Sequence, residues 1–312
     1  TVSLSVSVIF STHDRPESLA RAVAAALAQT RRPDELIVVC DGAGGVPDSV
    51  AAQAARAGVA FQSARQPVAC LPASRNRGVA MAHGDVVLLA DDDVLLPEDY
   101  LQRLLAMYEA DPAGQVAVIG GVLVGPARGW AGRLYAALAD GLARNRWARR
   151  CCAARYVRLP AALRGRLKPA ERLQGGAISA RRAVVAAEPF DESLPGYALG
   201  EDLEFCWRVG RRHAAFVASE LRARHEVSAG GRPDPAGRGR MYVRNMLHIA
   251  DRLADGAAGT RVVLGLHLGG AIVQGLAWAA ARPGRGHLAL AGGMVRELGA
   301  RLVAAVRRTL CG

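Results

Sequence analysis

The sequence contains a single lysine, few aromatic residues and no closely spaced pair of cysteines. Lys168 is the one lysine among forty basic residues, a skew towards arginine that is typical of a GC-rich coding bias. Aromatic residues make up 5% of the 312 residues, and no recognised nucleic-acid-binding element is present. We therefore expect no nucleic-acid partner, although the pI is about 10.3.

The six cysteines show neither a CxxC pair nor the spacing of a disulfide framework, which argues against a disulfide scaffold and a zinc ribbon. Reduced cysteines are typical of the cytoplasm. The first residues, TVSLSVSVIFSTHDRP, lack the basic start and long apolar run of a signal peptide. The sequence thus predicts a cytoplasmic protein that is not secreted.

Positive and negative charges are unevenly distributed along the chain. Residues 1–124 contain nine basic and fourteen acidic groups, whereas residues 125–207 have a balance of +6 and residues 208–312 a balance of +11. A basic excess is typical of proteins that bind nucleic acid, an anionic membrane surface or a phosphorylated ligand. The net charge of +12 does not by itself choose among these partners.

Apolar runs alternate with amphipathic patterns over the first 125 residues. Strands are predicted at 2–10, 35–42, 59–63, 85–93 and 115–125, and helices at 17–30, 48–57, 74–84 and 97–111. This alternation predicts an α/β fold with a mostly parallel sheet and helices on both faces. Ligands of such sheets bind beyond the carboxyl ends of the strands, where Asp41 and the run 91–93 fall.

The sharpest chemical signal is LLADDDVLLP, in which three consecutive carboxylates follow a strand. They repel one another, and a bound cation relieves that repulsion. Asp91 and Asp93 point the same way if the segment stays extended, and hard oxygen ligands of this kind suit Mg²⁺ or Mn²⁺ holding a diphosphate. The alternative is a solvated acidic turn that caps the helix beginning near Pro97.

A second acidic motif, GEDLEFCWR, follows the flexible segment PGYALG. Glu201 and Asp202 stand at the start of an apolar-patterned helix, where two adjacent carboxylates can position a substrate hydroxyl and accept its proton. Capping of the helix N-terminus is the alternative. Capping accounts for one of the two acids, but not for the pair together with the aspartate triad.

The order of the motifs resembles that of the family 2 inverting glycosyltransferases of the GT-A fold. The matching segments are SVIFSTHDRPESLARAVAAALAQT, ELIVVCDGA, ASRNRGVAMAHGDVVLLADDDVLLP, LQGGAISARR and GEDLEFCWR, which cover about residues 5–210. The resemblance implies a Rossmann-like mixed sheet, Mn²⁺ or Mg²⁺ as cofactor, and a nucleotide-diphosphate-sugar donor. It also implies inversion at the anomeric carbon and a hydroxyl acceptor, which is a glycan, a lipid-linked molecule or a small molecule.

The resemblance assigns roles by position in the motifs. Asp202 matches the general base, and Glu201 matches the residue that orients the acceptor or the base. The matching metal ligands are Asp91, Asp93 and His225. The matching nucleotide-sugar-binding residues are Thr12, Asp14, Arg15, Asp41, Arg75, Asn76, Arg77, Asp91, Asp92, Gln174, Gly175 and Gly176. The alternatives without a catalytic or binding role are a structural histidine at position 225, solvated arginines at a helix N-terminus for residues 75–77, and a simple turn at Gly175 and Gly176.

We expect a GT-A catalytic domain over residues 1–225, in which 1–124 bind the donor and 125–225 form the acceptor and catalytic part. Residues 226–312 are expected to be helical. Residues 262–281 have no formally charged side chain and reach the length of a membrane span, although four glycines lower their apolarity. A span, a shallow membrane contact and a packed helix remain open. Flanking arginines suit anionic headgroups, so we expect the inner face of the cell membrane.

Three other functions compete with glycosyl transfer. A nucleotidyltransferase acting on sugar phosphates shares the alternating architecture and the acidic metal site. That class usually has a glycine-rich, basic phosphate loop after the first strand, where this sequence has STHDRP. A nucleic-acid- or membrane-binding module without catalysis follows from the charge alone. A catalytically inactive relative is disfavoured because DDD, ED and His225 are all present.

Overall fold

The computed structural model of the 312-residue chain describes residues 3–125, 153–170, 172–226, 228, 230, 232–253, 258–281 and 286–311. The chain forms two compact units. Unit 1 comprises Thr1–Pro126, Cys151–Tyr197 and Glu201–Gly231, and unit 2 comprises Ala127–Arg150, Ala198–Gly200 and Arg232–Gly312. The expected division of roles between 1–124 and 125–225 stays a prediction.

Unit 1 alternates strands and helices through its first half, as the hydrophobic pattern predicts. Its elements there are β1 (Val6–Thr12), α1 (Pro16–Leu27), β2 (Glu35–Cys40), α2 (Asp48–Ala57), β3 (Ala60–Arg65), α3 (Leu71–Met81), β4 (Val86–Asp91), β5 (Val94–Leu95), α4 (Tyr100–Glu109) and β6 (Val116–Val124). The described second half contains η1 (Ala153–Arg155), η2 (Ala161–Leu163), β7 (Leu167–Pro169), β8 (Ala177–Arg181), α7 (Arg182–Ala187), α8 (Glu201–Val209) and β9 (Ala214–His225).

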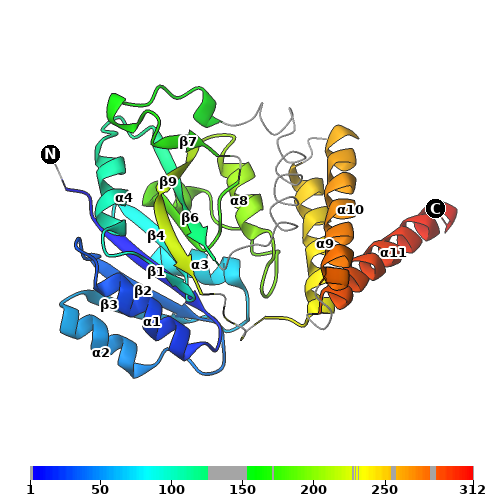
Figure 1. Ribbon diagram of the computed structural model, residues 1–312, viewed down its shortest axis with the longest axis horizontal. Coiled ribbons are helices and arrows are strands. Elements are labelled where there is room, and N and C mark those ends of the chain that lie inside the picture. The colour runs from blue at the N-terminus through cyan, green and yellow to red at the C-terminus, as the bar shows by residue number, and fades with distance from the viewer. Residues whose placement is uncertain are drawn as a thin grey trace. The chain divides into compact units, whose positions relative to one another are not determined.

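The described strands form one mixed sheet in the order β3-β2-β1-β4-β8-β6-β9-β5, with β7 pairing to β9 (Figure 1). Strands β3, β2, β1 and β4 run parallel to one another. Strand β8 enters antiparallel between β4 and β6, while β6 and β9 are parallel. The predicted α/β class with a mixed sheet is confirmed.

Helices cover both faces of the sheet. Successive residues of a strand point to opposite faces, so one strand contributes to the buried cluster on each side. On one side Val8 and Phe10 of β1 share a buried cluster with residues of α1, α2 and α4. On the other side Ile9 of β1 packs in a cluster with Val79 of α3 and Phe205 of α8. Strands β1, β2 and β4 are thus buried on both faces, as their continuous apolar runs predict, whereas the edge strand β3 is partly exposed.

The register of the parallel strands brings the predicted polar residues to one edge of the sheet. Thr12 at the end of β1 lies opposite Cys40, and Ser11 lies opposite Asp91 at the end of β4. Strand β4 stops at Asp91, and the next two residues form a turn before β5. The extended conformation that would point Asp91 and Asp93 the same way is therefore interrupted.

Unit 2 contains three long helices, α9 (Pro235–Leu253), α10 (Ala258–Ala281) and α11 (His287–Cys311), among its described residues. Helices α9 and α11 pack closely through small residues, since a Cβ on Gly239 would meet the backbone of Leu290 and one on Gly293 would meet the backbone of Ala236. Helix α10 packs against α11, where a Cβ on Gly275 would lie 3.1 Å from the Cβ of Ala291. The helical C-terminal region is as expected. Among the helices that the structure describes, none combines the length and apolarity needed to cross a membrane.

Candidate active site

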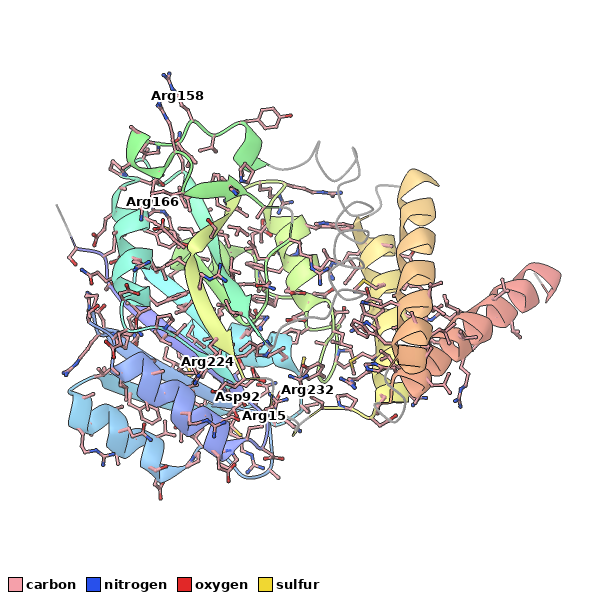
Figure 2. The ribbon with its side chains drawn as sticks, viewed as in Figure 1. Arg15, Asp92, Arg158, Arg166, Arg224 and Arg232 are labelled. Atoms are coloured by element: carbon pink, nitrogen blue, oxygen red, sulfur yellow. The ribbon has the colours of Figure 1, made fainter. Side chains whose placement is uncertain are left out.

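The site begins where β4 leaves the sheet, at a buried aspartate that is held from two sides. Asp92 is 1% exposed; Thr12 Oγ1 donates a hydrogen bond to its Oδ2 at 2.6 Å, and Arg15 Nη1 donates to its Oδ1 at 3.0 Å (Figure 2). Burial raises the pKa of Asp92 to about 6, against the opposing effects of Thr12 and Arg15. Asp92 therefore fixes the loop after β1 to the end of β4.

Asp93 is partnered from β9 and from the segment after it. Its Oδ1 lies 3.1 Å from His225 Nε2, and its Oδ2 accepts a hydrogen bond from the Ser228 backbone at 3.0 Å. Burial favours a higher pKa, yet the hydrogen bonds from His225 and Ser228 prevail and lower the pKa of Asp93 to about 2. Pairing of Val94 with His225 across β5 and β9 sets this geometry. The structure thus brings together the predicted ligands Asp93 and His225.

Arg75 of α3 lies buried between the two acidic motifs. Its Nη2 is 3.0 Å from Asp91 Oδ1, its Nη1 is 2.9 Å from Glu201 Oε1, and Nη2 also donates to the Gly175 carbonyl at 3.0 Å. Its guanidinium carbon lies 5.2 Å from the centre of the Phe190 ring. The alternative of a solvated arginine is excluded here, because only 3% of the Arg75 side chain is exposed.

Glu201 and Asp202 form the first turn of α8, beside the loop that precedes β8. Burial, reinforced by the neighbouring charge of Asp202, raises the pKa of Glu201 to about 8 even though Arg75 opposes the shift. Asp202 Oδ2 accepts a hydrogen bond from the Gly175 backbone at 3.2 Å. The pair therefore faces the backbone of Gly175 as well as the guanidinium of Arg75.

Positions 175 and 176 of this loop are glycines, because a side chain at either position would crowd the neighbouring carboxylates. A Cβ on Gly175 would lie 3.0 Å from Glu201 Oε1 and 3.2 Å from Asp202 Cβ, and one on Gly176 would lie 3.0 Å from Asp91 Oδ2. Gln174 holds the loop from the other side, since its Oε1 accepts a hydrogen bond from the Leu123 backbone at 2.6 Å. Close packing against the site, rather than a simple turn, explains these glycines.

The predicted nucleotide-binding residues of the first two loops are also engaged within the protein. Asp41 Oδ1 lies 2.8 Å from His13 Nδ1, while Asp41 Oδ2 accepts a hydrogen bond from the Cys70 backbone at the start of α3. Asp14 adopts a positive φ of 51° and accepts a hydrogen bond from Gly44 at 2.9 Å, which lowers its pKa. His13 is not among the predicted site residues, although the motif STHDRP places it beside the predicted Asp14.

Asn76 contacts the segment that precedes α8 rather than the two acidic motifs. The Asn76 side chain bonds both backbone groups of Phe190 and the carboxylate of Glu192, so it fixes the segment before α8. Arg77 is exposed. Arg75 is thus the residue of this trio that the structure brings to the acidic motifs.

The acceptor and catalytic part predicted over residues 125–225 begins with an arginine-rich stretch, of which the structure describes residues 153–170. Figure 2 shows Arg158 and Arg166 at the end of unit 1 remote from Asp92. Arg166 pairs with Glu220 there at 2.6 Å. Residues 126–152, which include the other part of this predicted segment, lie outside the described residues.

The metal ligands predicted at this edge do not assemble as a set of three. Asp91 is paired with Arg75, whereas Asp93 and His225 contact each other. Within the described part of the chain, no group of three or more His, Cys, Asp or Glu side chains is arranged to hold a metal ion. The geometry supplies a carboxylate and imidazole pair, with the 32% exposed Asp91 side chain at the end of β4.

Comparison with known proteins points to one family. Residues 7–151 match the model of the family described as Glycosyl transferase family 2. A curated glucosyl-dolichyl phosphate glucuronosyltransferase of Haloferax volcanii is 31% identical over 123 residues. That match covers 39% of each protein, so this chain aligns with about two fifths of the relative's length.

Solved structures share the fold over most of the chain. The crystal structure of S. aureus TarS 1–349 matches this chain with a TM-score of 0.58 at 15% identity, and the match covers 95% of this chain and 79% of that one. The mannosyltransferase PcManGT of Pyrobaculum calidifontis, solved with GDP-Man and Mn²⁺, has a TM-score of 0.56 at 15% identity, covering 97% and 88%. Glucosyl-3-phosphoglycerate synthase of Mycobacterium tuberculosis has a TM-score of 0.51 at 19% identity, covering 82% of each chain. The fold is therefore GT-A.

Proposed function

We propose, from the match of residues 7–151 to the model of glycosyl transferase family 2, that this chain is a glycosyltransferase that moves a sugar from a nucleoside-diphosphate sugar to a hydroxyl acceptor. The observation that carries the proposal is the buried guanidinium of Arg75. It contacts Asp91 at the end of β4, Glu201 at the start of α8 and the Gly175 carbonyl. Two acidic motifs that are distant in sequence thereby share one site.

Asp202 is the proposed general base of an inverting transfer. An acceptor hydroxyl has a pKa far above neutrality, so a carboxylate must take its proton as attack proceeds. The hydroxyl oxygen then bonds to the anomeric carbon, the bond from that carbon to the diphosphate oxygen breaks, and the nucleoside diphosphate leaves. The hydrogen bond from the Gly175 backbone to Asp202 Oδ2 orients this carboxylate.

Glu201 is proposed to orient the acceptor or the base rather than to compete for the proton. With its pKa raised to about 8, Glu201 is mostly protonated at neutral pH, so Asp202 is not opposed by a second full negative charge. Arg75 holds Glu201 Oε1 at 2.9 Å. Two neighbouring carboxyl groups with different environments can thus divide the two roles.

We also propose that the transfer depends on Mn²⁺ or Mg²⁺ held by Asp93 and His225, with Asp91 as the third predicted ligand. The donor set fits such an ion, because Mg²⁺ is commonly bound through one or two carboxylates together with substrate phosphates. When bound, the cation would stabilise the negative charge that develops on the departing diphosphate. Asp93 stays ionised for this task, since its pKa is lowered to about 2.

The donor nucleotide is proposed to lie along the loops that follow β1 and β2. Thr12 and Arg15 order this region through Asp92, and Asp14 and Asp41 join the two loops to their neighbours. The remaining predicted donor contacts, at Asn76, Arg77, Gln174 and Gly176, stay proposals with the roles that their motifs imply. Solved relatives carry UDP-GlcNAc and GDP-Man, which supports a nucleotide-sugar donor here.

The acceptor is proposed to be lipid-linked, and the place of action the inner face of the cell membrane. The name of the Haloferax relative refers to a dolichyl phosphate substrate, which supports this acceptor class. Nucleotidyl transfer is the weaker alternative, because the family match and the solved relatives are glycosyltransferases.

Turnover of a donor panel tests the proposal. The purified chain is incubated with UDP- and GDP-sugars and Mn²⁺, and release of the nucleoside diphosphate is measured with lipid-linked and soluble acceptors. Asp202→Asn is expected to lower kcat at least ~1000-fold and to change the donor Kd less than ~3-fold, because it removes proton transfer and leaves the donor loops intact.

Asp48→Asn, an exposed aspartate at the start of α2, is the matched control and should leave both values unchanged. Absence of donor binding across the panel would contradict the proposed donor site. Release of sugar 1-phosphate in place of a nucleoside diphosphate would favour nucleotidyl transfer. Unchanged turnover in Asp202→Asn would exclude this residue as the base.

A further inference from the structure

Helices α10 and α11 present large apolar side chains to solvent. On α10, Val273 and Leu276 are 66% and 48% exposed, and on α11 Leu288, Val295 and Leu302 are 65%, 53% and 66% exposed. Isolated exposed leucines are ordinary, but several large exposed apolar side chains on each of two packed helices are typical of an interaction surface. We call these five residues the α10–α11 apolar face.

The part of this face on α11 is a continuous stripe. Leu288, Val295 and Leu302 are seven residues apart, so they lie on one side of the helix. Gly292 and Gly299 fall between them on the same side by helical spacing. Arg301 and Glu297 pair with each other at 2.9 Å, one turn apart, whereas Arg296 borders the stripe, its Nη2 lying 3.8 Å from where a Cβ on Gly292 would stand.

The stripe is not the side of α11 that packs within unit 2. Close packing on α9 occurs at Gly293, where an added Cβ would meet the backbone of Ala236, and Gly275 of α10 packs on Ala291. Ala291 and Met294 are buried, whereas the stripe residues are not. The apolar stripe is therefore additional to the internal core of the three helices.

Helix α10 supplies a second apolar surface beside α11. The Trp278 and His287 rings lie 5.2 Å apart, which ties the end of α10 to the start of α11. Residues 262–281 contain no formally charged side chain. Apolar surface is thus offered by both helices, with a partly exposed tryptophan at their junction.

The charge of the region indicates what covers this face. Residues 232–312 contain twelve arginines and four acidic residues. Two copies of so basic a surface repel each other, whereas a surface of anionic lipid attracts it and accepts apolar side chains below the headgroups. We propose that the α10–α11 apolar face docks on an anionic bilayer, with the two helices lying along its surface.

Docking of unit 2 on a bilayer does not depend on the proposed sugar transfer, but it would place that transfer at a membrane surface. A chain held at the bilayer by unit 2 would meet an acceptor carried by a lipid at that surface. Vesicle binding needs neither donor nor turnover, so its failure and the failure of glycosyl transfer are separate results.

Co-sedimentation of the full chain with sucrose-loaded vesicles tests the proposal. Phosphatidylcholine vesicles with ~30% phosphatidylglycerol are compared with pure phosphatidylcholine, at low and high salt. We expect the anionic vesicles to bind at least ~10-fold more tightly, and added salt to weaken that binding. The triple variant Leu288→Glu, Val295→Glu, Leu302→Glu should reduce the partition coefficient a further ~10-fold or more.

The matched control is Ala289→Glu, Ala300→Glu, Ala304→Glu, which adds the same charge at exposed positions of α11 outside the stripe. Circular dichroism checks that both variants keep their helices. Equal losses in the stripe and control variants, or no binding of the wild-type chain to anionic vesicles, would overturn the proposal. So would a wild-type dimer in vesicle-free solution that the stripe variant converts to a monomer, because a second copy would then cover the face.

Discussion

The edge of the sheet in unit 1 buries charged side chains, whereas helix α11 of unit 2 exposes large apolar ones. In unit 1, Asp92, Asp93 and Glu201 are buried, and each is held by hydrogen bonds or ion pairs with named partners. In unit 2, Leu288 and Leu302 are about two-thirds exposed on α11. The first region specifies one geometry, whereas the second offers a surface without fixed partners.

This difference follows from what each kind of burial requires. A buried charge is tolerated only where partners replace its hydration, so the carboxylates of unit 1 demand fixed positions for Arg15, Arg75 and His225. An apolar face needs only a medium that excludes water, and its contribution grows with the area covered. Chemistry on a defined bond suits the first region, and contact with a lipid surface suits the second.

Removal of Arg75 should break the ordered region most severely. Arg75→Met removes the buried hydrogen bonds to Asp91, to Glu201 and to the Gly175 carbonyl, which is expected to lower the free energy of unfolding by roughly 3–5 kcal/mol and kcat by at least ~100-fold. Arg75→Lys should recover part of both losses, because one ammonium group cannot bridge two carboxylates as a guanidinium does. Denaturant unfolding and turnover at a temperature where the variants are folded measure the two effects.

Arg208→Met is the control for a purely structural ion pair. Arg208 lies on α8 and pairs with Glu188 and Glu204 rather than with Glu201 or Asp202. Its loss should destabilise the fold while kcat stays within ~3-fold of the wild type. If Arg75→Met keeps wild-type turnover, the buried arginine is structural and the coupling of the two motifs has no role in catalysis.

The hydrophobic pattern predicted most elements in the first half of unit 1, because continuous apolar runs and amphipathic helices are local properties of the sequence. It placed the strands before Asp41 and Asp91 and the helix that begins at Glu201. It did not predict the environment of Arg75, since that depends on β8 entering antiparallel beside β4 and bringing Gly175 close. Long-range pairing of this kind leaves no periodic signal.

The same limit applies to His13 and Asp41. The sequence indicated an aspartate at a strand end, but both of its oxygens are used by His13 and by the backbone at the start of α3. In unit 2, composition predicted helices and an apolar segment, whereas the exposed side of α11 emerged only from the packing of α9 against Gly293.

The stability of unit 1 should depend on pH through Glu201. Its pKa is 4.5 ordinarily and about 8 in the folded chain, so folding favours the protonated form. The resulting stabilisation is complete below about pH 4.5 and is lost as the pH rises through 8. Glu201→Gln cannot ionise, so its free energy of unfolding relative to the wild type should rise by roughly 2–4 kcal/mol between pH 4.5 and pH 9.

Asp93 supplies the control of opposite sign. Its pKa is lowered to about 2, so its contribution is present above pH 3.8 and is lost as the pH falls towards 2. Asp93→Asn should therefore be less stable than the wild type by a constant amount above pH 3.8, and this gap should close as the pH falls towards 2, which urea titrations across the pH range would measure. A Glu201→Gln profile parallel to that of the wild type up to pH 9 would contradict a protonated Glu201.

Substitutions of glycine by alanine are expected to have the smallest effects. Their effect on stability should have opposite signs in the two regions. A Cβ on Gly175 would press on Glu201 Oε1 and on Asp202 at 3.0–3.2 Å, so Gly175→Ala must displace the carboxylates by a few tenths of an ångström. We expect a ~5–10-fold loss of kcat and a loss of about 1 kcal/mol in stability. Gly299 lies on exposed α11 with no atom within 4 Å of an added Cβ, so Gly299→Ala should stabilise the helix by ~0.5–1 kcal/mol and leave kcat unchanged. Both effects are measured by thermal unfolding and turnover. Equal effects at the two positions would show that the loop before β8 accommodates a Cβ and that its glycines do not position the carboxylates.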